Sequence, residues 1–284
     1  MAELKKILVT GARGNLGGSV VRALVDSGLP VIAGGTQPEE MQIAGGVEKV
    51  KINYEQPDTV KSALQGVDRL FLVAPPLDWD APAKVAPVIH QAKAAGVQHI
   101  IFNSALGVDQ NEEAPLRVIE KQVMASGLAY TVLRPNFFME NFSRGFIAPM
   151  IAQGGIYLAA GDAATSFIST EDIAAVAAVA FQKQHFGAEY NLTGPAALDH
   201  GQVARIISEV SGRQIQYHAL SEDAMMQGAR DQGLPDGVIR YMAVLYDAVR
   251  SGWMSAVTDN VQKVIGRQPI SFGDLAQKNA AVWK

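Results

Sequence analysis

The chain has 284 residues, of which 48% are hydrophobic and 18% are charged, and its formal net charge is −4. A chain of this size and hydrophobicity suits one α/β unit with a smaller appendage, and its composition is far from that of disordered proteins. The absence of cysteine excludes disulfide scaffolds, thiolate zinc sites, iron–sulfur clusters and cysteine nucleophiles.

Charge and apolar patterning also narrow the partners. No run of Lys and Arg indicates a nucleic-acid partner, and no apolar stretch approaches the roughly 20 residues that cross a bilayer. The first six residues lead into only a short apolar run, so we expect no signal peptide. We therefore expect a cytoplasmic protein, monomeric or homodimeric, that binds a small molecule and contacts neither nucleic acid nor a membrane.

The first half of the chain alternates strand-like and helix-like segments. Residues 7–10 form a β-branched apolar run that ends at Gly11, and a helical pattern follows over 16–24. Further strands are predicted at 31–33, 47–52, 70–73, 99–102 and 131–133, and further helices at 58–64, 82–95 and 116–126. This alternation predicts an α/β fold, a Rossmann-type doubly wound parallel sheet with its ligand site at the carboxyl ends of the strands.

The regular alternation of predicted strands and helices ends after Pro135. We expect a Rossmann domain over residues 1–135, to which 166–194 return with an alanine-rich helix at 170–181. Residues 136–165 and 195–284 are expected to form a smaller, mainly helical substrate-binding lobe. Its helices are predicted at 201–210, 222–232, 235–250, 260–265 and 272–283, and one strand near 215–218.

The motif that carries chemistry lies between the first strand and the first helix. Residues 10–17 read TGARGNLG, in which three glycines serve a tight turn, close approach of the backbone to a pyrophosphate, and close helix–strand packing. A glycine-rich loop without a ligand is the alternative, but the place of the motif in the first βα unit favours dinucleotide binding at the helix N-terminus. The predicted binding residues are Gly11, Ala12, Arg13, Gly14, Asn15, Leu16 and Gly17.

The residues after the second strand bear on the choice of cofactor. An Asp or Glu that would accept hydrogen bonds from the ribose of NAD is missing at the strand end, where Thr36 stands, and Glu39 and Glu40 lie beyond Pro38. We expect a 2′-phosphate to meet no repulsion there. Arg13 would supply the cation and Thr36 a hydroxyl, which favours NADP(H) over NAD(H); a solvated loop arginine is the alternative.

Several segments carry a family resemblance: the glycine-rich loop, 125–142 (ASGLAYTVLRPNFFMENF), 167–174 (FISTEDIA) and 190–212 (YNLTGPAALDHGQVARIISEVSG). With them the chain resembles the NmrA-like, atypical branch of the short-chain dehydrogenase/reductases over essentially its whole length. The stretches 245–248 and 259–266 are similar to the triphenylmethane reductase and NADPH-quinone oxidoreductase members. The resemblance implies a Rossmann domain that binds NADP(H), a small C-terminal substrate domain, and a cleft between them.

The resemblance also implies roles for residues outside the loop. Thr36 stands where many relatives have a basic residue, which keeps the choice of cofactor open. The cofactor would further contact, from the adenine edge to the nicotinamide, Asn53, Tyr54, Ala74, Pro75, Asn103, Ser104, Pro135 and Asn136. A substrate pocket would be lined by Phe137, Phe138, Tyr241 and Tyr246, for which ordinary core packing is the alternative. The histidines are scattered, so we predict no metal site.

One expected feature of the superfamily is missing. Its typical dehydrogenases use Tyr-x-x-x-Lys, in which the tyrosine moves a proton to or from a substrate oxygen. In the closest alignment to this motif, Arg117 stands in place of the tyrosine and Lys121 in place of the lysine. We expect both to lie on a charged helix face that is exposed to water. No catalytic residue is therefore predicted.

Two functions fit this pattern. The first is an NADPH-dependent reductase that transfers hydride to a planar electrophile such as a quinone or dye, which accepts hydride without a strong acid. The alternative is an NAD(P)-binding redox sensor, a regulatory protein of the NmrA type without turnover. A sugar-nucleotide epimerase is disfavoured because it too needs the tyrosine.

Overall fold

The structure is a computed structural model that describes residues 6–43 and 46–284. Residues 1–5, on which the exclusion of a signal peptide partly rests, lie outside the described part. Within the described residues, no helix combines the length and the apolar character that crossing a bilayer requires.

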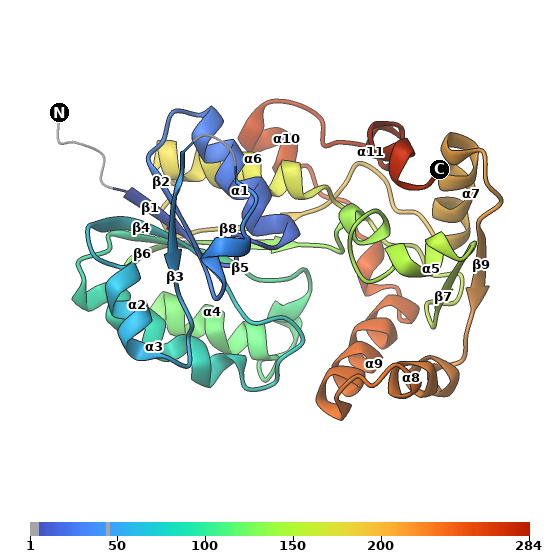
Figure 1. The fold of residues 1–284 in the computed structure, drawn as a ribbon, viewed down its shortest axis with the longest axis horizontal. Helices are drawn as coiled ribbons and strands as arrows, with labels where there is room; N and C mark the ends of the chain where they lie inside the picture. The colour runs from blue at the N-terminus through green and yellow to red at the C-terminus, as the bar shows by residue number, and fades with distance from the viewer. Residues whose placement is uncertain (1–5, 44–45) are drawn as a thin grey trace.

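Seven parallel strands form the larger sheet, in the order β3-β2-β1-β4-β5-β6-β8 (Figure 1). Their bounds are β1 (Lys6–Val9), β2 (Val31–Gly35), β3 (Glu48–Lys51), β4 (Val67–Val73), β5 (His99–Asn103), β6 (Ala129–Pro135) and β8 (Ala188–Leu192). The central strands are apolar along their length because both faces of the sheet are covered: Leu8 and Phe71 are fully buried. The strand order reverses between β1 and β4, where such sheets bind ligands. This topology confirms the predicted doubly wound parallel sheet.

Helices cover both faces of this sheet. One face packs against α1 (Asn15–Asp26), α6 (Thr170–Lys183) and α10 (Asn260–Ile265), and the other against α2 (Pro57–Ala63), α3 (Ala81–Ala94) and α4 (Pro115–Ala125). A buried hydrogen bond of 2.9 Å between the hydroxyls of Ser19 and Thr170 joins α1 to α6. The segment that carries α10 was expected in the lobe, but α10 packs against α6 and β8.

The remaining elements form a smaller unit beside the sheet, on the right of Figure 1. It contains α5 (Ala148–Ala152), α7 (His200–Ser211), α8 (Glu222–Asp231), α9 (Asp236–Arg250) and α11 (Phe272–Asn279), with the short parallel pair β7 (Gly155–Leu158) and β9 (Gln216–Ala219). Its own apolar core includes the rings of Phe142 and Phe167, which pack around His200. Burial lowers the pKa of His200 to about 4, so this histidine is a neutral core residue.

Candidate active site

The glycine-rich loop disfavours a side chain at two of its three glycines, Gly11 for its backbone conformation and Gly17 for lack of space. Gly11 has a φ of +65°, a conformation that other residues rarely adopt. A Cβ atom on Gly17 would lie 2.2 Å from the carbonyl oxygen of Gly11, whereas one on Gly14 would meet that oxygen at 3.3 Å. The first turn of α1 therefore lies directly on the loop. Because Gly14 has no side chain, the outer surface of the loop at this position is backbone alone.

The N-terminus of α1 is open to an anion. Gly14 is the N-cap residue, no side chain caps the helix, and its first turn carries no acidic residue. Unpartnered backbone N–H groups and the helix dipole favour a negative charge at such an end. Together with the bare surface at Gly14, this arrangement fits the diphosphate of a dinucleotide.

The surroundings of Arg13 correct one expectation from the sequence. A 3-10 turn over Pro38–Glu40 directs the chain back toward the glycine-rich loop, so that Glu40 lies 2.8 Å from an Nη of Arg13. The other Nη donates to Gln37 Oε1 at 2.5 Å. The expectation that a 2′-phosphate would meet no repulsion is therefore wrong, because a carboxylate lies against the only loop cation.

The predicted adenine-edge residues follow β3. Asn53 orders the turn by accepting a hydrogen bond from the backbone N–H of Glu55, at 3.0 Å. The hydroxyl of Tyr54 donates to the carbonyl oxygen of Val73 at 2.8 Å, and burial raises its pKa. Tyr54 thus links the end of β3 to the end of β4, and it stays protonated.

The predicted residues after β4 and β5 lie at neighbouring strand ends. Ala74 is buried directly after β4, beside the partly exposed Pro75. Asn103 ends β5, and its Oδ1 is buried without a hydrogen-bond partner among the described residues. The backbone N–H of Ser104 donates to the carbonyl of Leu133 at 2.8 Å, which holds this loop along β6. An unpartnered acceptor at a strand end suits the carboxamide of a nicotinamide.

Beyond β6 the chain crosses into the smaller unit. Pro135 ends the strand, and the side chain of Asn136 donates to Ser166 Oγ and to the carbonyl of Met254, both at 2.8 Å. Its Oδ1 accepts from the backbone N–H of Phe137. The side chain of Asn136 therefore joins three segments of the chain.

The four predicted pocket residues divide into separate groups. Phe137 packs on the core of the smaller unit with Tyr246, their ring centres 6.2 Å apart, while Phe138 packs on the core of the sheet. Tyr246 is 2% exposed, and burial raises its pKa. Tyr241 faces Trp79 instead, with ring centres 5.0 Å apart.

Trp79 was missed in the sequence analysis. It lies in the loop between β4 and α3, and its Nε1 donates to the carbonyl oxygen of Gly237 in α9 at 3.0 Å. In the same loop Leu77 has a φ of +53°, which is uncommon for a residue with a branched side chain. An isolated tryptophan between two predicted elements gave no sign of its partner, because the contact spans 158 positions.

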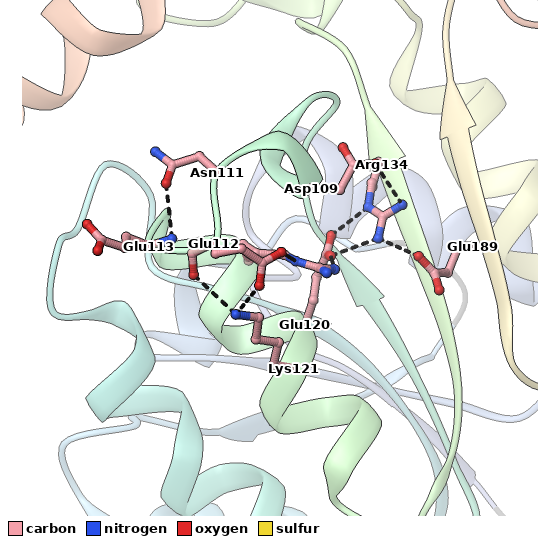
Figure 2. A network of polar contacts seen from close by, with 9 residues as sticks. Asp109, Asn111, Glu112, Glu113, Glu120, Lys121, Arg134 and Glu189 are labelled. Carbon is pink, nitrogen blue, oxygen red and sulfur yellow. Dashed lines mark hydrogen bonds and ion pairs between the residues drawn. The ribbon is translucent and has the colours of Figure 1, made fainter.

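The helix that would carry a catalytic Tyr-x-x-x-Lys carries ion pairs instead (Figure 2). Glu120 is fully buried and accepts two hydrogen bonds of 2.8 Å from Arg134, which also contacts Glu189. Burial alone would raise the pKa of Glu120, but the hydrogen bonds from Arg134 and from Arg117 hold it below its usual range. This network links α4 to the carboxyl end of β6 and to the start of β8.

The same network corrects the reading of Arg117 as a water-exposed residue. Its side chain is only 20% exposed because it lies between Glu120, at 2.9 Å, and Glu112, at 3.0 Å. Lys121 is more exposed and pairs with Glu112. Glu120 escaped the sequence analysis because its partner Arg134 lies on another element, 14 positions away.

A family model for the NmrA-like family matches residues 3–252. The chain belongs to the NmrA-like family. An NAD(P)H azoreductase of Xenophilus azovorans is 32% identical over 98% of this chain and 99% of its own length. Quinone oxidoreductase 2 of Escherichia coli, solved in complex with NADPH, superimposes with a TM-score of 0.82 at 29% identity, covering 96% of this chain and 99% of that one.

The structure of a triphenylmethane reductase of Citrobacter sp. is also similar to this chain. Its structure matches with a TM-score of 0.83 at 25% identity, over 97% of this chain and 99% of its own. These matches run over nearly the whole of both chains, so the smaller unit is shared as well as the sheet. They confirm the family resemblance inferred from the sequence.

Replacement of Gly17 by Ala should weaken nucleotide binding while sparing the rest of the fold. The added Cβ would clash with the backbone of Gly11 and displace α1 from the loop. We expect the affinity for NADPH, measured by fluorescence titration, to fall by at least about tenfold, the equivalent of 1.4 kcal/mol. Gly18→Ala is the matched control, since its Cβ would meet nothing closer than 3.4 Å. Equal losses in both variants would contradict the proposed clash.

Replacement of Glu120 by Ala should destabilise the protein by about 3–5 kcal/mol, because Arg134 would remain buried without its principal partner. Chemical denaturation at pH 7 measures the loss. Glu112→Ala removes an exposed carboxylate from the same network and should leave the unfolding midpoint near that of the parent. A midpoint for Glu120→Ala that matches the Glu112→Ala value would show that the buried pair is dispensable.

Proposed function

We propose that this protein is an NAD(P)H-dependent reductase that transfers hydride to a planar electrophile such as a quinone or a dye. The observation that carries the proposal is the bare glycine-rich loop beneath the open N-terminus of α1, which fits a dinucleotide diphosphate. The named relatives support the chemistry, since they include an azoreductase and a quinone oxidoreductase.

The bound nicotinamide would supply the hydride, so the protein has to hold the cofactor and the acceptor together and exclude water. The glycine-rich loop would hold the diphosphate, and Asn103 would accept a hydrogen bond from the carboxamide. The loop of Trp79, after β4, and the segment of Asn136, after β6, both reach the smaller unit from the strand ends on either side of β5. An acceptor would lie between these strand ends and α9.

The acceptor class follows from the groups that the site offers. Arg117 and Lys121 are engaged in ion pairs, and burial raises the pKa values of Tyr54, Tyr241 and Tyr246. None of these groups is placed to act as a strong acid toward a substrate oxygen. A cationic dye needs no proton when hydride reaches its central carbon, and a quinone becomes a phenolate that takes its proton from water. Simple ketones need the missing acid.

Turnover with a panel of acceptors tests this proposal. Purified protein with NADPH should oxidise the cofactor when a triphenylmethane dye or a quinone is added, and should do so far more slowly with aliphatic ketones. Absorbance of the reduced nicotinamide follows the reaction. Tight binding of NADPH without oxidation by any acceptor would refute the reductase and favour the redox sensor.

We further infer that NADP(H) is preferred over NAD(H), through Arg13. Its guanidinium is the cation of the glycine-rich loop and is 56% exposed, so a 2′-phosphate can reach it. Arg13→Ala should weaken NADPH binding by about tenfold and NADH binding by less than twofold, since a charge-assisted hydrogen bond contributes about 1.5–3 kcal/mol. Calorimetric titration with both cofactors measures this, and equal losses would remove the proposed role of Arg13.

A further inference from the structure

The guanidinium of Arg13 is already occupied by protein acceptors. One Nη pairs with Glu40 at 2.8 Å and the other donates to Gln37 at 2.5 Å, while Gln37 Nε2 donates to the second carboxylate oxygen of Glu40 at 2.9 Å. The three side chains close a ring of polar contacts beside the end of β2. A phosphate binds arginine best through two parallel N–H donors, so it competes with Glu40 and Gln37 for this edge.

We propose that Glu40 is a specificity-determining residue that opposes the 2′-phosphate of NADP(H) and accepts the 2′-hydroxyl of NAD(H). The proposal rests on the proposed function, because it assumes that a nicotinamide dinucleotide lies on the glycine-rich loop. Arg13 attracts the phosphate and Glu40 weakens that attraction, so the protein uses both cofactors with a limited preference for NADP(H). Dinucleotide-binding proteins that prefer NAD carry an acidic residue at the end of the second strand, and this chain has none there. Glu40, in the turn after β2, would take its place.

The turn that carries Glu40 is anchored at its C-terminal end. Pro38 starts the 3-10 helix, and Met41, which follows it, is 3% exposed and packs in the core of the sheet. The carbonyl oxygen of Met41 accepts a hydrogen bond of 2.6 Å from Lys49. Because Met41 packs in the core, the turn is held beside the glycine-rich loop, with the carboxylate of Glu40 within reach of Arg13.

The expected loss of affinity for the 2′-phosphate depends on the charge of Glu40 and on how exposed it is to water. A phosphate on Arg13 would place a second anion within several ångströms of the Glu40 carboxylate, and the two side chains are 56% and 45% exposed. At such exposure water and salt screen most of the repulsion, which leaves a penalty of about three- to tenfold in affinity. An exposed ion pair contributes little to folding, so selectivity changes much more than stability.

Binding of adenosine 2′,5′-bisphosphate and of 5′-ADP tests the proposal without any reaction. Both ligands carry the adenosine, and only the first has a 2′-phosphate. We expect the Glu40→Gln variant to bind the bisphosphate about three- to tenfold more tightly than the parent and to bind 5′-ADP more weakly, by calorimetry at fixed ionic strength. Glu39→Gln is the matched control: it removes the same charge one position away, and Glu39 makes no ion pair within the described ranges. It should change both affinities by less than about twofold.

Three results would overturn the proposal. Weaker binding of the bisphosphate by Glu40→Gln would show that Glu40 positions Arg13 for the phosphate. An equal effect of Glu39→Gln would show a response to net charge alone, and unchanged affinities in Glu40→Gln would remove any role of the residue. In each case the parent still binds both nucleotides, so the proposed function stands. A parent that binds neither nucleotide would overturn the proposed function and this proposal together.

Discussion

A side chain at position 17 cannot coexist with the loop that precedes it, because its Cβ would lie 2.2 Å from the carbonyl oxygen of Gly11. This contact lets the first turn of α1 lie directly on the end of β1. The N-terminus of the helix is thereby presented at the carboxyl edge of the sheet, next to the point where strand order reverses. The other proposed contacts with a dinucleotide take their positions from this one.

The smaller unit is joined to the sheet at the same edge. Asn136, directly after β6, bonds to Ser166 and Met254, and Trp79, in the loop after β4, reaches Gly237 in α9. The two strands that lead into these contacts flank β5, which ends at Asn103. A nicotinamide at these strand ends would therefore lie close to the smaller unit, to which the ring pairs Trp79–Tyr241 and Phe137–Tyr246 belong in part. This environment suits hydride transfer to a flat acceptor.

The features that were predicted from sequence are local ones. The glycine-rich loop and the first six strands of the sheet follow from spacing within about ten residues, and the structure has them near the predicted positions. The seventh strand, β8, was not predicted. The missed features join distant positions. Glu120 looked like part of a solvated helix because Arg134 is on another element, and Glu40 looked remote from the cofactor because the turn after Pro38 is not evident from the sequence. Burial of charge and reversal of the chain both depend on tertiary contacts.

The central claim is that the cofactor supplies the hydride and that the protein contributes position without a strong acid. Single-turnover reduction of a cationic triphenylmethane dye by NADPH deuterated at C4, on the face the enzyme uses, tests it most directly. We expect one deuterium per molecule at the central carbon of the product, found by mass spectrometry, with a rate that changes little between about pH 6 and pH 8 because no protein acid takes part. A product without deuterium, or a rate that falls steeply across that range as an acid titrates, would contradict it.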